Sequence, residues 1–187
     1  MGERLIINVF NKKDDETPLY NIYYHWSGFA DSSLNELLLL VENDCYKSIP
    51  EVVKFITKNG GTVVSEDIPL YQEKYDSSYE MPESASRNKG LVALSEEQIN
   101  NSILWGEEFI DVYLNDNTFN IEKLFRFADD NILEDYDIDK DKCLHDVKFE
   151  NQLSLDNIHV LLDKIEYLKD NNAAVFVNEE YFIISAW

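Results

Sequence analysis

The segment LSLDNIHVLLDKIEYLKDN, residues 153–171, places its apolar side chains at the spacing of one helix face. These side chains are Leu155, Ile158, Leu161, Leu162, Ile165 and Leu168. Residues three and four apart lie on the same side of an α-helix, so the stripe is continuous and needs an apolar surface to cover it. The next segment, AAVFVNEEYFIISAW, has two apolar runs around a short polar turn, which predicts a β-hairpin. The fold therefore has to bury a long helix next to strands.

The first third of the chain combines the same elements. Residues 4–10 and 18–26 are rich in Ile, Val and Tyr and flank a polar stretch, so they predict a hairpin. Helices are expected within residues 31–43 and 48–61. Each of these segments has a Ser followed three residues later by a Glu, the spacing of a capping box (Ser33 and Glu36, Ser48 and Glu51).

The middle of the chain predicts further short elements. Strands are expected in 62–65 and 89–94, a hairpin in 108–121, and helices in 95–105 and 122–130. Residues 66–88 have no period and read as an irregular connection that could be mobile. The fold class is thus α+β, with antiparallel hairpins forming a sheet and about three to four helices packed on it. We expect a single domain over residues 1–187, with an acidic segment at 129–150.

Charge limits the choice of partners. The chain has 16 basic and 37 acidic residues, a formal net charge of -21, while 44% hydrophobic residues suffice for a core. Direct binding to nucleic acid or to anionic lipid is disfavoured, because both require basic side chains. The longest apolar run, residues 37–41, is too short to span a membrane. No secretory signal is evident and the two cysteines form no disulfide framework, so we expect a cytoplasmic protein with a basic partner.

The stretch ILEDYDIDKDKCLHD, residues 132–146, has an acid at every second position from Asp135 to Asp141. In an extended strand these carboxylates would line one face at intervals of about 6.7 Å. Phosphates of duplex DNA advance about 3.4 Å per nucleotide along each strand, so such a row would match every second phosphate. The plainer alternatives are a solvated loop and an acidic edge strand that prevents aggregation.

Metal sites fit the sequence poorly. The same stretch aligned on a calcium-binding EF-hand loop puts Lys140 where the turn needs Gly and Lys142 where an apolar residue is expected. Zinc would have a single close pair of ligands, Cys143 and His145. No metal and no cofactor are therefore expected.

The stretch YYHWSG, residues 23–28, offers a different kind of site. His25 would act as a general base and Ser27 as a nucleophile if both side chains shared one face. The alternative is that His25 and its aromatic neighbours pack the hairpin against the first helix. No third group at a recognisable spacing supports the catalytic pair, and both interpretations stay open.

Some of these residues carry a resemblance. The first motif begins with Met1, Gly2 and Arg4, continues with an apolar strand, and ends with Tyr23, His25, Trp26 and Gly28. The second motif is NKGLVALSEE, followed by Trp105 and the alternating FIDVYL. The chain resembles in this respect a loose group of small, mostly uncharacterised phage and bacterial proteins. The resemblance implies phage or prophage origin and carries no activity with it.

Charge and resemblance together predict a phage-encoded, non-enzymatic inhibitor of a host nucleic-acid-handling defence protein, of the anti-CRISPR or anti-restriction type. An acidic, nucleic-acid-mimicking surface would bind the basic host protein in the host cytoplasm. The residues expected at the centre of the contact are Glu134, Asp135, Asp137, Asp139 and Asp141, extended by Asp129, Asp130, Glu107, Glu108 and Asp111. The alternatives are a small enzyme or ligand-binding domain using the His25/Trp26 strand end, and a scaffolding protein whose acidity serves solubility. The oligomeric state is open.

Overall fold

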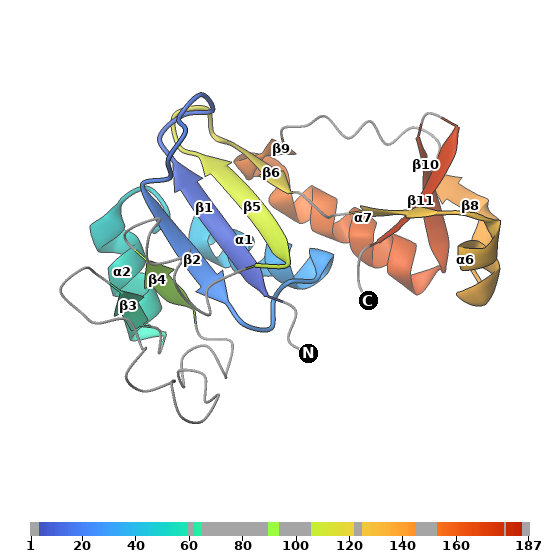
Figure 1. Cartoon of the computed structure of the whole chain (residues 1–187), viewed down its shortest axis with the longest axis horizontal. Helices are drawn as coiled ribbons and strands as arrows, with labels where there is room; N and C mark the ends of the chain where they lie inside the picture. Colours follow the sequence, from blue (N-terminus) through green and yellow to red (C-terminus); the bar gives the residue numbers. More distant parts are fainter. Residues whose placement is uncertain are drawn as a thin grey trace.

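The structure, a computed structural model, describes residues 4–59, 62–64, 90–93, 106–121, 125–144, 153–177 and 179–184. The predicted irregular connection at 66–88 and the predicted helix at 95–105 lie outside these ranges. The described residues form two β-sheets with helices packed between and beside them (Figure 1). The expected α+β class is therefore confirmed, with two sheets in place of the single sheet that we expected.

The larger sheet has seven strands in the order β3-β4-β2-β1-β5-β6-β9. Their bounds are β1 Leu5–Phe10, β2 Tyr20–Tyr24, β3 Thr62–Val64, β4 Leu91–Ala93, β5 Glu108–Tyr113, β6 Thr118–Ile121 and β9 Leu153–Ser154. The two predicted hairpins are present as the antiparallel pairs β1–β2 and β5–β6. Two pairs, β1–β5 and β3–β4, are parallel, which a pattern of local hairpins does not reveal.

The smaller sheet has four strands in the order β7-β11-β10-β8. Their bounds are β7 Phe125–Ala128, β8 Asp139–Leu144, β10 Ala173–Val177 and β11 Glu180–Ile184. The hairpin β10–β11 is the one predicted after the long helix. The short helix predicted over 122–130 is wrong, because residues 125–128 are extended and pair with β11 along their whole length.

The described helices are α1 Ala30–Glu42, α2 Ile49–Lys58, α6 Asp130–Asp135 and α7 Ile158–Asp170, with a 3₁₀ turn at Leu155–Asn157 before α7. The capping box predicted at Ser33 is wrong: α1 begins earlier, the carbonyl of Phe29 accepts from the Ser33 amide at 2.7 Å, and Ser33 is buried inside the helix. Helix α2 begins where predicted. There the Ser48 carbonyl accepts from the amides of Glu51 and Val52, and the Ser48 hydroxyl donates to the Glu51 carboxylate at 2.9 Å.

The core is organised around α7. All six residues of its predicted stripe are buried, as the sequence indicated. They belong to one apolar cluster that also contains Leu5 and Ile7 of β1, Leu34 of α1, and Val175 of β10. Figure 1 shows α7 extending from the seven-stranded sheet to the four-stranded one. Helix α7 therefore joins the two sheets through a continuous core. None of the helices among the described residues has the length and apolar character needed to cross a membrane.

We expect Ile165→Ala to lower the free energy of unfolding by about 2–5 kcal/mol, because it leaves a cavity at a fully buried position. Urea denaturation followed by circular dichroism measures the change. Glu166→Ala on the exposed face of α7 is the matched control and should shift stability by no more than about 0.5 kcal/mol. Equal effects of the two substitutions would contradict the central position of the stripe.

Candidate functional site

The acidic segment is built on α6 and β8, which Figure 1 places at the end of the molecule that carries the four-stranded sheet. Asp129 caps α6, since its carboxylate accepts from the amide of Ile132 at 3.0 Å. Leu133 anchors the helix by packing in a small apolar cluster with Ala128, Ala174 and Ile183. The chain then turns through Tyr136 and Asp137 into β8.

The predicted single row of aspartates does not form. Asp135 ends α6, Asp137 has a left-handed backbone with φ of 52°, and only Asp139 and Asp141 lie in β8. Even there the Asp141 amide donates to the Asp139 carboxylate at 2.9 Å, and the register against β10 shifts. The spacing argument is therefore wrong. One physical reason is that aspartate side chains accept hydrogen bonds from nearby backbone amides, as Asp139 does here. The other is that the cap at Asp129 starts helix α6, so residues 130–135 are not extended.

The acidic segment is nevertheless an exposed, electronegative surface. Its exposed acids are Asp129, Asp130, Glu134, Asp135, Asp137 and Asp141, and Asp139 is half-buried. Within the described residues, two lysines form ion pairs in this segment: Lys140 with Asp130, and Lys142 with Asp139 at 3.6 Å. The hydrogen bond to Asp130 raises the pKa of Lys140. Exposed ion pairs such as these contribute little to the free energy of folding. The excess of acids in this segment therefore does not serve to stabilise the fold through ion pairs.

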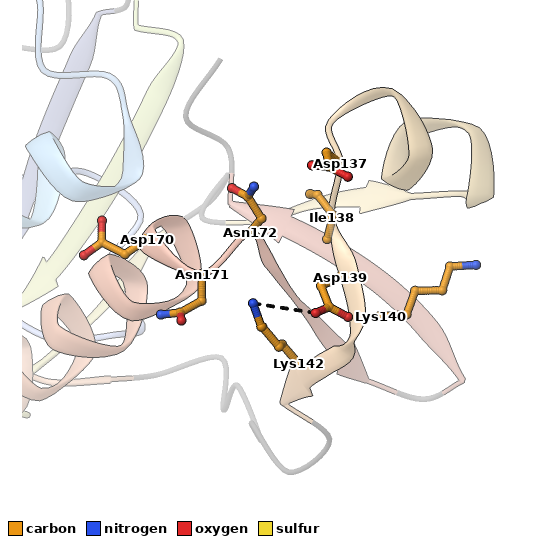
Figure 2. A pocket seen from close by; sticks show the side chains of 8 residues that line it. All are labelled: Asp137, Ile138, Asp139, Lys140, Lys142, Asp170, Asn171 and Asn172. Atoms are coloured by element: carbon orange, nitrogen blue, oxygen red, sulfur yellow. Dashed lines mark ion pairs between the residues drawn. The ribbon is translucent and has the colours of Figure 1, made fainter.

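A polar hollow of about 540 Å³ lies between the end of α7 and β8. Figure 2 shows the side chains that line it. It is lined by Asp137, Ile138, Asp139, Lys140, Lys142, Asp170, Asn171 and Asn172. The Asp139 amide donates to the Asn172 carbonyl at 2.7 Å and fixes the start of β8 against the turn after α7. In the part of the chain that the structure describes, no group of three or more His, Cys, Asp or Glu residues could hold a metal ion. The hollow is therefore a polar depression within the acidic segment, with no metal-binding cluster among its described residues.

Three predicted contact residues lie elsewhere. Glu107 pairs with Arg4 at 3.4 Å, Glu108 is 1% exposed, and Asp111 accepts from the Asn8 amide at 2.7 Å. All three are at or in β5 of the seven-stranded sheet, and Figure 1 separates this strand from α6 and β8. The structure does not bring them together with the acidic segment, because β5 belongs to the seven-stranded sheet and β8 to the four-stranded one. The charge pattern of the sequence does not reveal which sheet a strand joins.

A second candidate site lies where β2 ends beside the starts of β1 and β5. The Nδ1 atom of His25 is 2.9 Å from the Tyr23 hydroxyl, and Arg4 links Tyr23 to Glu107. Burial, and then the charge of Arg4, lower the pKa of His25, which is 7% exposed. Burial raises the pKa of Tyr23 to about 12. Trp26 is 46% exposed and stands edge-on to the imidazole at 4.6 Å between centroids.

This arrangement brings together Arg4, Tyr23, His25 and Trp26, four residues that carry the resemblance described above. Ser27 behaves differently, because it is fully buried and its hydroxyl donates to Glu36 of α1 at 2.9 Å. That bond ties the end of β2 to α1. The geometry therefore gives Ser27 a packing role and leaves His25 as a buried imidazole hydrogen-bonded to Tyr23.

A third polar feature was missed by the sequence reasoning. Asn21, Asn8, Asp111 and Asn120 face one another in register across β2, β1, β5 and β6. Asn and Asp are depleted in strands, so their recurrence in the middle of four predicted strands was the available signal. The register that aligns them involves the parallel pair β1–β5 and could not be read from local pattern.

Neither a protein-family model, nor a curated protein, nor a solved structure matches this chain.

The lowered pKa of His25 predicts a loss of stability in mild acid. The unfolded chain binds the proton near the ordinary value of 6.5, whereas the folded chain binds it only at lower pH. The stability that His25 contributes is thus fully present well above the ordinary pKa of 6.5 and is lost as the pH falls below that value. Chemical denaturation at several pH values measures it.

The control is His25→Asn, whose side-chain amide can donate to or accept from the Tyr23 hydroxyl but does not titrate. Its stability should fall less than that of the wild type between pH 7 and pH 5. Parallel pH profiles for the two proteins would show that His25 does not carry this dependence.

Proposed function

We propose that the protein is a non-enzymatic binding protein whose acidic segment, through its acids between Asp129 and Asp141, occupies a basic surface of a nucleic-acid-handling protein. The observation that supports this is the exposure of the carboxylates on α6 and β8 in a chain of net charge -21. A surface of this kind attracts a basic groove at a distance and speeds the encounter.

The local construction also favours recognition. Leu133 packs α6 against the sheet, and the hydrogen bond of the Asp139 amide fixes the start of β8. The acids of both elements are therefore attached to an ordered backbone. Acids on rigid elements lose less conformational freedom on binding than acids on a loose tail. The contact is expected to weaken with salt, because exposed charges more than about 8 Å apart are screened at physiological ionic strength.

The finer part of the proposal concerns the partner. The resemblance to phage proteins favours a host defence nuclease or CRISPR effector, which the protein would inhibit in the cytoplasm of the host cell. Mimicry in this form does not require a regular phosphate spacing. It requires only that negative charge fill the groove that nucleic acid would occupy.

Charge reversal at Glu134 and Asp135 tests the proposal. Both are exposed in the last turn of α6, where a lysine interacts favourably with the helix dipole, so the fold should be retained. We expect Glu134→Lys/Asp135→Lys to slow association with the partner by about tenfold or more. The measurement is affinity capture of basic nucleic-acid-binding proteins from a bacterial lysate, with surface plasmon resonance on the protein recovered.

The matched control is Asp163→Lys/Glu166→Lys on the exposed face of α7, which changes the net charge by the same amount. It should capture the same proteins as the wild type, and excess duplex DNA should release them. Equal capture by the wild type and both variants would refute the acidic-segment contact.

A second candidate function, a small enzyme or ligand-binding domain at the His25/Trp26 strand end, is supported by the hydrogen bond that holds His25 to Tyr23. An imidazole held through one ring nitrogen presents the other in a fixed direction, as a general base requires. A ligand lost on His25→Asn with unchanged partner capture would favour this function.

A further inference from the structure

Phe127 is the most exposed large apolar side chain among the described residues, at 52%. It belongs to β7, the outermost strand at one end of the four-stranded sheet. Its ring stands edge-on to that of Phe182 in β11, with 6.2 Å between the centroids. An apolar side chain that stays in water contributes little hydrophobic free energy to folding. The ring of Phe127 is therefore accessible to a partner.

The sheet register places this ring at the end of an apolar row. Phe127 lies opposite Phe182, and Phe182 lies opposite Val175 of β10. Val175 is 1% exposed and belongs to the main apolar cluster, and the partly buried Phe182 packs against that cluster. Exposure thus increases from β10 through β11 to β7. The row extends the apolar core to the molecular surface at Phe127.

Two carboxylates lie beside this pair of rings. The β7–β11 register, continued by one pair of residues, brings Asp129 opposite Glu180, and the backbone of Asp129 is still extended. Alternate residues of a strand share a face, so both acids are on the face of Phe127 and Phe182. Both are exposed, and like charges opposite each other on neighbouring strands are destabilising. A cation placed beside them would relieve that repulsion.

The opposite face of β11 already combines an aromatic ring, an acid and a cation. There Lys140 Nζ is 5.7 Å from the ring centroid of Tyr181 and forms an ion pair with Asp130. Aromatic faces attract cations in this way. Within the described ranges, no lysine or arginine nitrogen lies over the ring of Phe127. A cation for Phe127 would have to come from outside these residues.

We propose that Phe127 anchors an arginine side chain of the basic partner, with the guanidinium plane stacked on the ring and Asp129 and Glu180 beside it. Arginine stacks on aromatic rings and pairs with carboxylates through the same planar group, whereas a lysine ammonium is more strongly hydrated. A second copy of this chain fits the ring poorly, because its net charge of -21 would bring further carboxylates to the two acids. The proposal rests on the proposed function, since the arginine belongs to the partner that contacts the acidic segment.

The anchor complements the acidic segment, which begins at Asp129, two residues after Phe127. Exposed charges mainly raise the rate of association, whereas an aromatic side chain covered by a partner mainly lowers the rate of dissociation. Acids alone would give a fast contact that is short-lived and sensitive to salt. The ring adds an interaction that salt screens much less.

Two peptides of equal length and charge, octa-arginine and octalysine, each with a fluorescein label, separate ring stacking from general attraction. At about 150 mM salt, where long-range attraction is screened, fluorescence anisotropy measures both affinities. The wild type should bind octa-arginine about two- to fivefold more tightly than octalysine, and Phe127→Ala should remove this preference. A preference that persists in Phe127→Ala, or no binding of either peptide by the wild type, would overturn the proposal.

Tyr167→Ala on α7 is the matched control, because Tyr167 is 49% exposed and lies outside both β7 and the acidic segment. This variant should keep the arginine preference, as should Phe127→Tyr, which retains the ring face. Equal loss in Tyr167→Ala would mean that any exposed ring attracts arginine and would overturn the anchor. If Phe127→Ala folds poorly, Phe127→Leu retains an apolar contact with Phe182 and decides the question by the same comparison.

Glu134→Lys/Asp135→Lys distinguishes this proposal from the proposed function. It should weaken both peptides by a similar factor and leave their ratio unchanged, because it alters charge and not the ring. Wild-type affinities in this variant, with the preference still lost in Phe127→Ala, would refute the acidic-segment contact and support the arginine anchor. A wild-type dimer that Phe127→Ala dissociates, detected by light scattering, would assign the ring to a second copy of this chain and overturn the proposal.

Discussion

The burial of the α7 stripe is the interaction on which the other features depend. Its residues share one apolar cluster with residues of β1 and α1 and with Ala173 and Val175 of the four-stranded sheet. A chain of net charge -21 repels itself when compact, so a continuous apolar core has to offset that cost. The acidic segment and the polar residues aligned across β2, β1, β5 and β6 are both positioned by sheets that this helix joins.

Much of the fold followed from local pattern. The α7 stripe, the hairpins β1–β2, β5–β6 and β10–β11, and the start of α2 were all readable, because periodicity and turn residues act over a few positions. The pattern failed where distant pairing decided the state. Residues 125–128 became β7 because β11 offered an edge to pair with, and the parallel pair β1–β5 joins strands about a hundred residues apart.

The candidate sites show the same division. Alternating acids from Asp135 to Asp141 suggested one extended row, but the cap at Asp129 and the anchor at Leu133 start a helix, and Asp137 turns the chain. Exposure of the acids was predictable from composition, whereas their arrangement was not. Two further features depend on the sheet register, which local sequence patterns do not predict. They are the link between Arg4, Tyr23 and Glu107 and the aligned polar residues from Asn21 to Asn120.

We propose that the acidic segment, on α6 and β8, contacts a basic partner. Hydrogen–deuterium exchange of this protein, alone and bound to the protein captured from lysate, tests it most directly. Contact through this segment should slow amide exchange within its described residues, 129–144, and leave exchange in β1 and β2 unchanged. Slowed exchange confined to β1, β2 and the His25 strand end, with residues 129–144 unaffected, would contradict it.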